Sequence, residues 1–122
     1  MNDIRYLLDE HIDPRVRKGV KRLIAAITIW CIGDAGVPAR GTLDAEILRW
    51  CESNSFILVT DNRKSMPAHL QDHIMAGGHI PGIFVLRPVS GIGEIIDELI
   101  LIWEASFPDE YQDQIRYLPI SG

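Results

Sequence analysis

The chain has 122 residues, of which 47% are apolar and 24% are charged, and its formal net charge is −5. This length and composition predict one globular domain, spanning residues 1–122, and exclude a disordered tail or a fibrous repeat. The acidic balance also excludes a protein whose whole surface binds nucleic acid non-specifically, although it leaves room for a local basic patch.

Several absences narrow the class of protein further. The two cysteines are too few for a disulfide scaffold or a four-thiolate metal site. No apolar run reaches the roughly 18 residues that a membrane-spanning helix needs, and nothing at the N-terminus has the pattern of a secretion signal. We therefore expect a soluble, cytoplasmic protein with no membrane contact.

Short apolar runs alternate with helix-forming segments along the chain. Strands are predicted at residues 4–8, 27–32, 56–60 and 83–86, with a further edge strand at 115–120. Helices are predicted at 14–25, from 44 onward, at 65–75 and at 91–106. This alternation predicts an α/β fold: a three-layer α/β/α sandwich with right-handed crossovers and a central, mainly parallel sheet of four to five strands.

Acidic residues follow two of the predicted strands, and ligands of open parallel sheets bind beyond the carboxyl ends of the strands. Asp9 and Glu10 follow the first strand and Asp61 follows the third, while Asp44 starts the helix that leads to that third strand. Carboxylates from distant parts of the chain suit Mg²⁺ or Mn²⁺, which take oxygen ligands and keep several waters. We predict a metal site of Asp9, Asp44 and Asp61 that activates water for attack on a phosphodiester. Glu10 is a further candidate ligand.

Each of these acids also has an explanation that needs no metal. Asp44 could be an N-cap and nothing more, because Asp is favoured at that position. Asp61 could shape a turn together with Asn62. Asp9 follows a buried strand, where no helix N-terminus needs a cap. It is therefore the strongest candidate metal ligand of the three.

Three segments carry a resemblance to a known family. They read Tyr-Leu-Leu-Asp-Glu-His at 6–11, Leu-Asp-Ala-Glu-Ile-Leu at 43–48 and Ile-Leu-Val-Thr-Asp-Asn at 57–62, and the run Gly-Ile-Phe-Val-Leu follows at 82–86. In this order and spacing they resemble the compact PIN-like domains, relatives of VapC-like toxins, over nearly the whole chain. The resemblance implies a Mg²⁺- or Mn²⁺-dependent ribonuclease, often held by an antitoxin, with Asp9, Asp44 and Asp61 as the catalytic acids.

The chain departs from larger PIN domains at one point. Those domains bring a further glutamate from a helical pair, and the connection before Asp44 is too short to hold that pair. Glu10 and Glu46 are available as substitutes, but neither matches by motif. A catalytically silent PIN-like module that binds RNA or an antitoxin is therefore the alternative. A phospho-acceptor receiver domain is a third hypothesis, disfavoured because receivers need a lysine after the last sheet strand and the last lysine here is Lys64.

Two groups of basic residues suit an RNA substrate. Arg63 and Lys64 directly follow Asp61, where a guanidinium or ammonium group would contact a phosphate beside the metal. The second group shares one face of the helix predicted at 14–25 and consists of Arg15, Lys18 and Arg22. A solvated helix face is the ordinary alternative for such a stripe.

The charge is distributed unevenly along the chain. No lysine or arginine occurs between Arg87 and Arg116, whereas that interval contains seven acidic residues. An acidic face of this kind would repel RNA and is suited to a basic partner or to a second subunit, so a homodimer is one of the predicted assemblies.

The remaining reactive residues have ordinary structural explanations. His69 and His73 stand one helical turn apart, a spacing that can bind zinc, but no third ligand lies in register with them. Cys31 and Cys51 lie in apolar surroundings without a neighbouring base, so both are predicted to be small core residues rather than nucleophiles.

Overall fold

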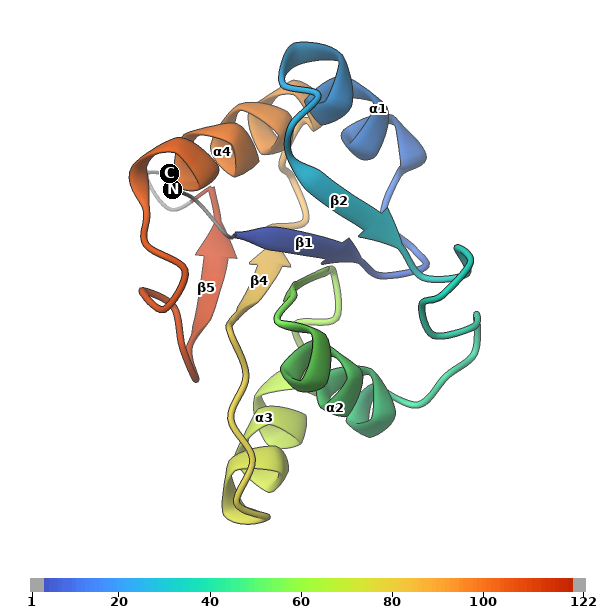
Figure 1. The fold of residues 1–122 in the computed structure, drawn as a ribbon, viewed down its shortest axis with the longest axis vertical. Helices are drawn as coiled ribbons and strands as arrows, with labels where there is room; N and C mark the ends of the chain where they lie inside the picture. Colours follow the sequence, from blue (N-terminus) through green and yellow to red (C-terminus); the bar gives the residue numbers. More distant parts are fainter. Residues whose placement is uncertain (1–3, 120–122) are drawn as a thin grey trace.

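The computed structural model describes residues 4–119, in which strands and helices alternate throughout (Figure 1). The strands are β1 (Arg5–Leu8), β2 (Thr28–Cys31), β3 (Ile57–Thr60), β4 (Ile83–Leu86) and β5 (Ile115–Leu118). The helices are α1 (Pro14–Leu23), α2 (Asp44–Asn54), α3 (Met66–Met75) and α4 (Ile92–Ala105). Each predicted element is present, and α1 ends two residues before the predicted end of its segment.

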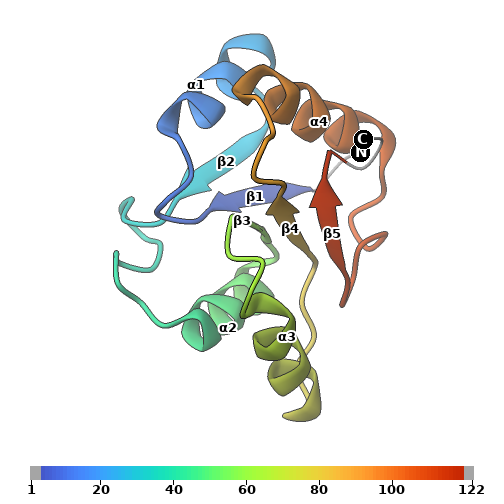
Figure 2. The same cartoon turned by 180° about the vertical axis from the view of Figure 1, so that it is seen from behind.

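The five strands form one parallel sheet in the order β2-β1-β3-β4-β5. Helices α1 and α4 cover one face, and α2 and α3 cover the other (Figure 2). The predicted three-layer α/β/α sandwich is confirmed, and the segment at 115–118 is an edge strand, as predicted. Residue 120 of the predicted edge strand lies outside the described residues.

Alternation along the strands divides the apolar core into two halves. Tyr6 and Leu8 of β1 point to the α1/α4 face, whereas Leu7 points to the α2/α3 face. Tyr6 is fully buried, and its hydroxyl donates a hydrogen bond of 2.8 Å to the backbone oxygen of Leu99 in α4. Burial raises the pKa of Tyr6, so the hydroxyl keeps its proton and remains a donor.

Helix α1 begins where the sequence provides both a cap and a proline. The Asp13 carboxylate accepts a hydrogen bond of 2.9 Å from the backbone N–H of Arg15, and Pro14 occupies the first helical position. Val16 and Val20 are buried one turn apart, which fixes the helix against the sheet. The first turn of α1 is thereby anchored beside the carboxyl end of β1.

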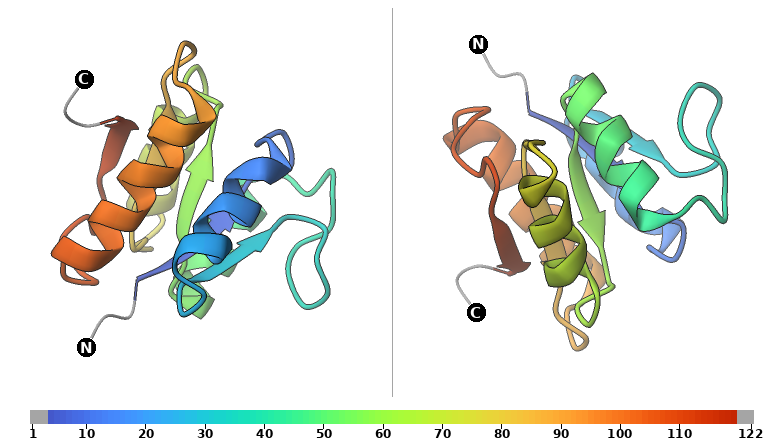
Figure 3. Two further views of the ribbon diagram at one scale, coloured as in Figure 1. Left: turned by 90° about the horizontal axis from the view of Figure 1, so that it is seen from above. Right: turned by 90° about the horizontal axis from the view of Figure 1, so that it is seen from below.

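The last crossover differs in hand from the one before it. The connections β3–α3–β4 and β4–α4–β5 step in the same direction across the sheet, yet α3 and α4 lie on opposite faces (Figure 3). Two such connections must have opposite hands, so the prediction of right-handed crossovers throughout is wrong. On the α1 face, Ile95, Leu99 and Ile102 of α4 belong to the same half of the core as Phe84 and Leu118 of β4 and β5.

We predict that Gly19→Val lowers the free energy of unfolding by about 1–3 kcal/mol through overpacking. A Cβ atom on Gly19 would lie 2.2 Å from Cδ1 of Ile96, so α1 and α4 must separate or Ile96 must rotate. Urea unfolding measures the effect. Gly93→Ala is the matched control in α4, because a Cβ there meets nothing within 4 Å. An unchanged midpoint for Gly19→Val would contradict this close helix contact.

Candidate functional site

The carboxyl ends of β1 and β3 form the centre of the candidate site. These two strands are neighbours in the sheet, and the chain leaves β1 for α1 on one face and β3 for α3 on the other. Ligand crevices of open α/β sheets lie where consecutive helices leave to opposite faces in this way. Asp9 and Asp61 each follow one of the two strands directly.

Asp9 is held by hydrogen bonds on both carboxylate oxygens. Its Oδ2 accepts a bond of 2.7 Å from the hydroxyl of Thr60, and its Oδ1 accepts one of 2.8 Å from the backbone N–H of Glu10. Thr60 is completely buried at the end of β3. The backbone N–H of Asp9 also donates to the carbonyl of Val59 at 2.9 Å, which continues the ladder between β1 and β3. The carboxylate therefore has a fixed orientation at the sheet edge.

A chain of hydrogen bonds links Thr60 to Asp44. The Thr60 hydroxyl oxygen accepts from the backbone N–H of Asn62 at 3.1 Å, and Nδ2 of Asn62 donates to Oδ2 of Asp44 at 3.2 Å. Nε2 of His69 in α3 lies 3.4 Å from the same Asp44 oxygen. Asp44 is the first residue of α2, the cap position is Leu43, and no side chain caps this helix. The explanation of Asp44 as a simple cap is therefore wrong.

Asp61 lies at the same carboxyl edge as Asp9, but its side chain points to the opposite face of the sheet. Successive residues at the end of a strand point to opposite faces, so Thr60 and Asn62 point toward α2 and α3 while Asp61 points toward α1 and α4. There Asp61 lines a crevice of about 370 Å³ together with His11, Arg63 and Arg87. The first turns of α1 and α4 form the other walls of this crevice.

The predicted metal ligands are only partly brought together. Within residues 4–119, no group of three or more His, Cys, Asp or Glu side chains is arranged to hold a metal ion. Asp9 and Asp44 are linked through Thr60 and Asn62, Asp61 faces the crevice, and Glu10 accepts a bond of 3.0 Å from the backbone N–H of Gly41. Across the same described residues, Asp9 forms no ion pair with a lysine or arginine.

This donor set fits a hydrated cation better than a fully protein-bound one. Mg²⁺ keeps several waters and is commonly bound through one or two carboxylates. Asp9 and Asp44 supply two half-buried carboxylates of this kind, and the bonds from Thr60 and Asn62 leave other oxygen lone pairs available. Carboxylate oxygens of this kind are the ligand type that Mg²⁺ and Mn²⁺ take.

The two predicted groups of basic residues lie differently relative to the crevice. Arg63 lines it, and Lys64 is exposed next in the chain. Only the first turn of α1 borders the crevice, and Arg15 there is paired with Asp13 at 2.8 Å. Lys18 and Arg22 lie farther along the helix, with Arg22 about 12 Å beyond the first residue at 1.5 Å per residue. The α1 row therefore leads away from the acids.

The paired histidines contact acids rather than a shared metal, and of the two cysteines predicted to be core residues Cys51 is buried whereas Cys31 is only partly buried. His73 pairs with Glu52 of α2 at 2.7 Å, and His69 pairs with Asp44, so each histidine of the spaced pair contacts a different acid. Burial, together with the nearby charge of Asp9, raises the pKa of Cys51 to about 12. Its thiol is thus protonated at neutral pH, which excludes it as a nucleophile.

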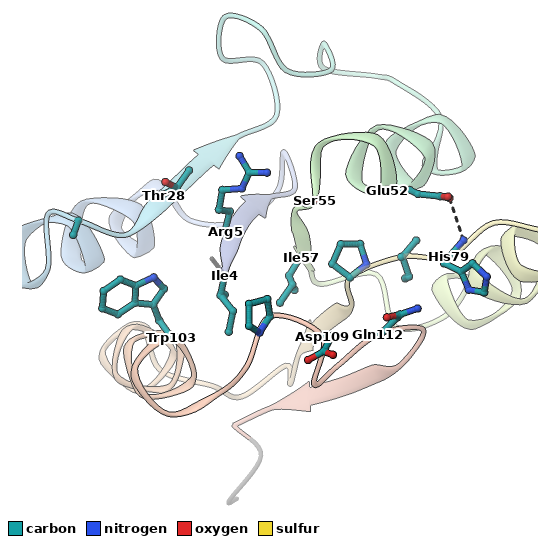
Figure 4. A pocket seen from close by; sticks show the side chains of 14 residues that line it. Ile4, Arg5, Thr28, Glu52, Ser55, Ile57, His79, Trp103, Asp109 and Gln112 are labelled. Atoms are coloured by element: carbon teal, nitrogen blue, oxygen red, sulfur yellow. Dashed lines mark hydrogen bonds between the residues drawn. The ribbon is translucent and has the colours of Figure 1, made fainter. Parts of the chain in front are cut away.

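A second cavity lies at the amino edge of the sheet, and its lining does not include Asp9, Asp44 or Asp61 (Figure 4). It has a volume of about 670 Å³ and is lined by Ile4 just before β1, Arg5 of β1, Ile57 of β3, Trp103 of α4 and His79 from the loop before β4. Arg5 donates to the carbonyl of Asn54 and lies 4.7 Å from the centre of the Phe56 ring. None of the predicted site residues lines this cavity.

His79, which lines the amino-edge cavity, is paired with Asp113. Nδ1 of His79 lies 2.7 Å from Oδ2 of Asp113, and the other Asp113 oxygen accepts from the backbone N–H of Ile80 at 2.9 Å. The hydrogen bond and the charge of Asp113 raise the pKa of His79. Partial desolvation acts to raise the pKa of Asp113, but the hydrogen bonds from His79 and Ile80 outweigh it, so the pKa of this carboxyl is lowered overall.

Three polar residues of the carboxyl edge were missed by the sequence-based prediction. Side chains alternate between the two faces of a sheet, and Leu8 and Val59 point to the α1/α4 face. Asp9 and Thr60, each one residue later, therefore point to the other face, and so does Asn62, whereas Asp61 does not. This alternation is the signal that could have identified Thr60 and Asn62. Arg87 directly follows β4, and that position past a parallel strand is the signal that could have identified it.

Comparisons with protein-family models, with curated proteins and with solved structures find no match to this chain. No helix within residues 4–119 combines the length and the apolar character that crossing a membrane requires. What the protein does must therefore be inferred from its own residues, above all from those at the carboxyl edge.

We predict that Thr60→Val lowers the free energy of unfolding by about 1–3 kcal/mol, because it leaves the half-buried N–H of Asn62 and a carboxylate oxygen of Asp9 without their partner. A double-mutant cycle with Asp9→Asn should give a coupling of about 0.5–3 kcal/mol. Thr28→Val in β2 is the control, since its hydroxyl forms no hydrogen bond within residues 4–119. Additive effects of Thr60→Val and Asp9→Asn would show that the two side chains are energetically independent.

We predict a defined pH window for the stabilising effect of His79. The raised pKa of His79 gives stability that is present below its ordinary value of 6.5 and is lost as the pH rises through the folded value. The lowered pKa of Asp113 gives stability that is present above 3.8 and is lost as the pH falls through the folded value. Because both are then charged, His79→Gln should lower the urea midpoint most between pH 3.8 and 6.5. A pH-independent difference would contradict the ion pair.

Proposed function

We propose that the protein is a Mg²⁺- or Mn²⁺-dependent ribonuclease of PIN-like type, acting at the carboxyl edge of its sheet. The observation that carries the proposal is the hydrogen-bonded series Asp9–Thr60–Asn62–Asp44, which brings carboxylates 35 positions apart to one edge. Asp9 and Asp44 would hold the cation. When bound, such an ion lowers the pKa of water and offsets negative charge that develops on a phosphodiester.

The chain's own residues supply orientation. The buried Thr60 hydroxyl holds the Asp9 carboxylate, and Asn62 is in turn fixed by Ser65, since Nδ2 of Asn62 donates to the Ser65 hydroxyl at 2.7 Å. These bonds keep two negatively charged groups in place before any substrate arrives. Such preorganisation lowers the cost of ordering the site during reaction.

The crevice on the other side of β3 supports binding of the RNA backbone. Arg63 and Arg87 line it and Lys64 is adjacent, and guanidinium groups bind phosphate oxygens in a bidentate manner. Asp61 lies among these cations, where it can serve as a further carboxylate for a metal or can orient the arginines. RNA would thus lie across the ends of β1, β3 and β4, with Asp9 on one side and the arginines on the other.

A toxin of a toxin-antitoxin pair, working in the cytoplasm, is the cellular role that we propose for this activity. The resemblance of residues 6–11, 43–48 and 57–62 to PIN-like proteins supports it. An antitoxin would inhibit the enzyme by covering the carboxyl edge. Its basic side chains would meet the carboxylates of Asp9 and Asp44.

A catalytically silent PIN-like module that binds RNA or an antitoxin is the second candidate. The finding that favours it is the lack of a three-ligand group among residues 4–119. A phospho-acceptor role is less well supported. The strand order β2-β1-β3-β4-β5 also occurs in that class, but the chain has no lysine after Lys64 to hold a phosphoryl group.

We predict that Asp9→Asn lowers Mn²⁺-stimulated cleavage of RNA at least about 100-fold, because loss of the charge weakens the hold on the cation. Asp44→Asn should also lower cleavage, and EDTA should abolish cleavage by the unchanged protein. The measurement is cleavage of a labelled single-stranded RNA by purified protein at fixed metal concentration.

Asp72→Asn is the matched control, because this exposed carboxylate lies on α3, away from Asp9. It should leave cleavage unchanged. Cleavage that survives Asp9→Asn would eliminate the proposed site. RNA binding without cleavage in any metal would favour the silent module.

A further inference from the structure

Helices α1 and α4 lie side by side on one face of the sheet and carry exposed charges of opposite sign (Figure 3). Both follow parallel strands and return from the carboxyl edge to the amino edge, so they run in the same direction. Gly19 of α1 packs against Ile96 of α4, which brings the helices close and fixes their relative level.

The basic row of α1 points outward and toward α4. Val16 and Val20 face the core and Gly19 faces α4. At 100° per residue, Lys18 then lies opposite the core, and Arg15 and Arg22 lie between Lys18 and the α4 side. This basic row is formed by Arg15, Lys18 and Arg22, all of which are exposed.

The acidic row of α4 points outward in the same layer. Ile95, Leu99 and Ile102 face the core, which places Asp97 and Glu104 on the opposite, exposed side of the helix. Because Gly19 lies against Ile96, these two residues are at the same height along the parallel helices. Asp97 is therefore at the height of the part of α1 that carries Lys18 and Arg22. The acidic row is defined as Asp97 and Glu104, with Glu94 at its edge.

These charges are not used within the described protein. In residues 4–119, no ion pair is formed by Lys18, Arg22, Asp97 or Glu104. Exposed apolar side chains accompany both rows: Leu23 at the end of α1 is 64% exposed and Leu101 of α4 is 57% exposed. A surface with unpaired charges of both signs and apolar groups beside them is suited to a complementary partner.

We propose that the α1/α4 layer is the interface of a homodimer. A two-fold axis that runs between the two helices and parallel to them places α1 of each copy over α4 of the other. The same axis preserves the level along the helices, so Lys18 and Arg22 of one protomer meet Asp97 of its partner. The surface is self-complementary, as a two-fold interface requires.

The proposal also predicts the character of the dimer. Two short helices on each side form a small contact, and exposed ion pairs are screened at distances beyond about 8 Å at physiological ionic strength. Leu23 and Leu101 add limited apolar area. The dimer should therefore form readily at low salt and dissociate as salt is added. Because the layer lies away from the acids at the carboxyl edge, this proposal does not depend on the proposed nuclease function.

Charge reversal provides a sharp test. Lys18→Glu with Arg22→Glu makes both rows acidic, and Asp97→Lys with Glu104→Lys makes both rows basic. Each variant alone should sediment at the 13.7 kDa of one chain at low salt, because like charges then oppose each other. An equimolar mixture of the two should form a heterodimer, because each helix row again meets its opposite.

Controls keep the result interpretable. Asp72→Lys on α3, on the other face of the sheet, should dimerise like the unchanged protein. Circular dichroism verifies folding, and the single reversals Lys18→Glu and Asp97→Lys form a milder second pair if a double variant unfolds.

Two outcomes would overturn the proposal. One is an unchanged protein that stays at 13.7 kDa at every concentration in low salt. The other is a mixture of reversed variants that fails to associate. If that failure is accompanied by loss of RNA binding in Lys18→Glu with Arg22→Glu, the basic row binds RNA instead. Heterodimer formation, by contrast, would support the proposed interface directly, since RNA binding by the row cannot produce it.

Discussion

The hydrogen bond from Thr60 to Asp9 is the contact on which the arrangement of the carboxyl edge depends. It joins β3 to the residue after β1 through a hydroxyl that is completely buried, so the hydroxyl cannot exchange its partner for water. The same hydroxyl receives the N–H of Asn62, whose amide then reaches Asp44. One side chain thus links two acids, Asp9 and Asp44, that come from separate parts of the chain.

The sequence predicts the fold well because its signals are local. Buried parallel strands appear as continuous apolar runs, and Asp13-Pro14 marks a helix start without help from distant residues. The candidate site is predicted less completely. Because Asp9 and Asp61 directly follow strands, the sequence predicts that both lie at the carboxyl edge. Side chains alternate between the two faces along a strand, however, and this alternation places Asp61 on the opposite side of the sheet from Asp9. The contact of Asp44 with Asn62 depends on how α2 packs, and no local pattern encodes that.

The two edges of the sheet and its α1/α4 face have different characters. The carboxyl edge holds the fixed carboxylates and the arginine-lined crevice, whereas the amino edge holds the cavity of about 670 Å³ and the His79–Asp113 pair. The outer α1/α4 surface carries the unpaired charges. The net charge of −5 does not reveal these differences between regions. The acids of the carboxyl edge, the acid that pairs with His79 and the acids of α4 contribute equally to that total.

The hand of the last crossover also affects the order in which the chain can fold during synthesis. The α2/α3 half of the core draws nearly all of its residues from positions 7–85, so it can assemble early as the chain emerges. The other half needs Leu99 and Ile102 from α4 to cover Tyr6 and Val20. Until α4 has left the ribosome, α1 and that face of the sheet stay exposed to water and to chaperones. Contacts of such high sequence separation also slow folding of the finished chain.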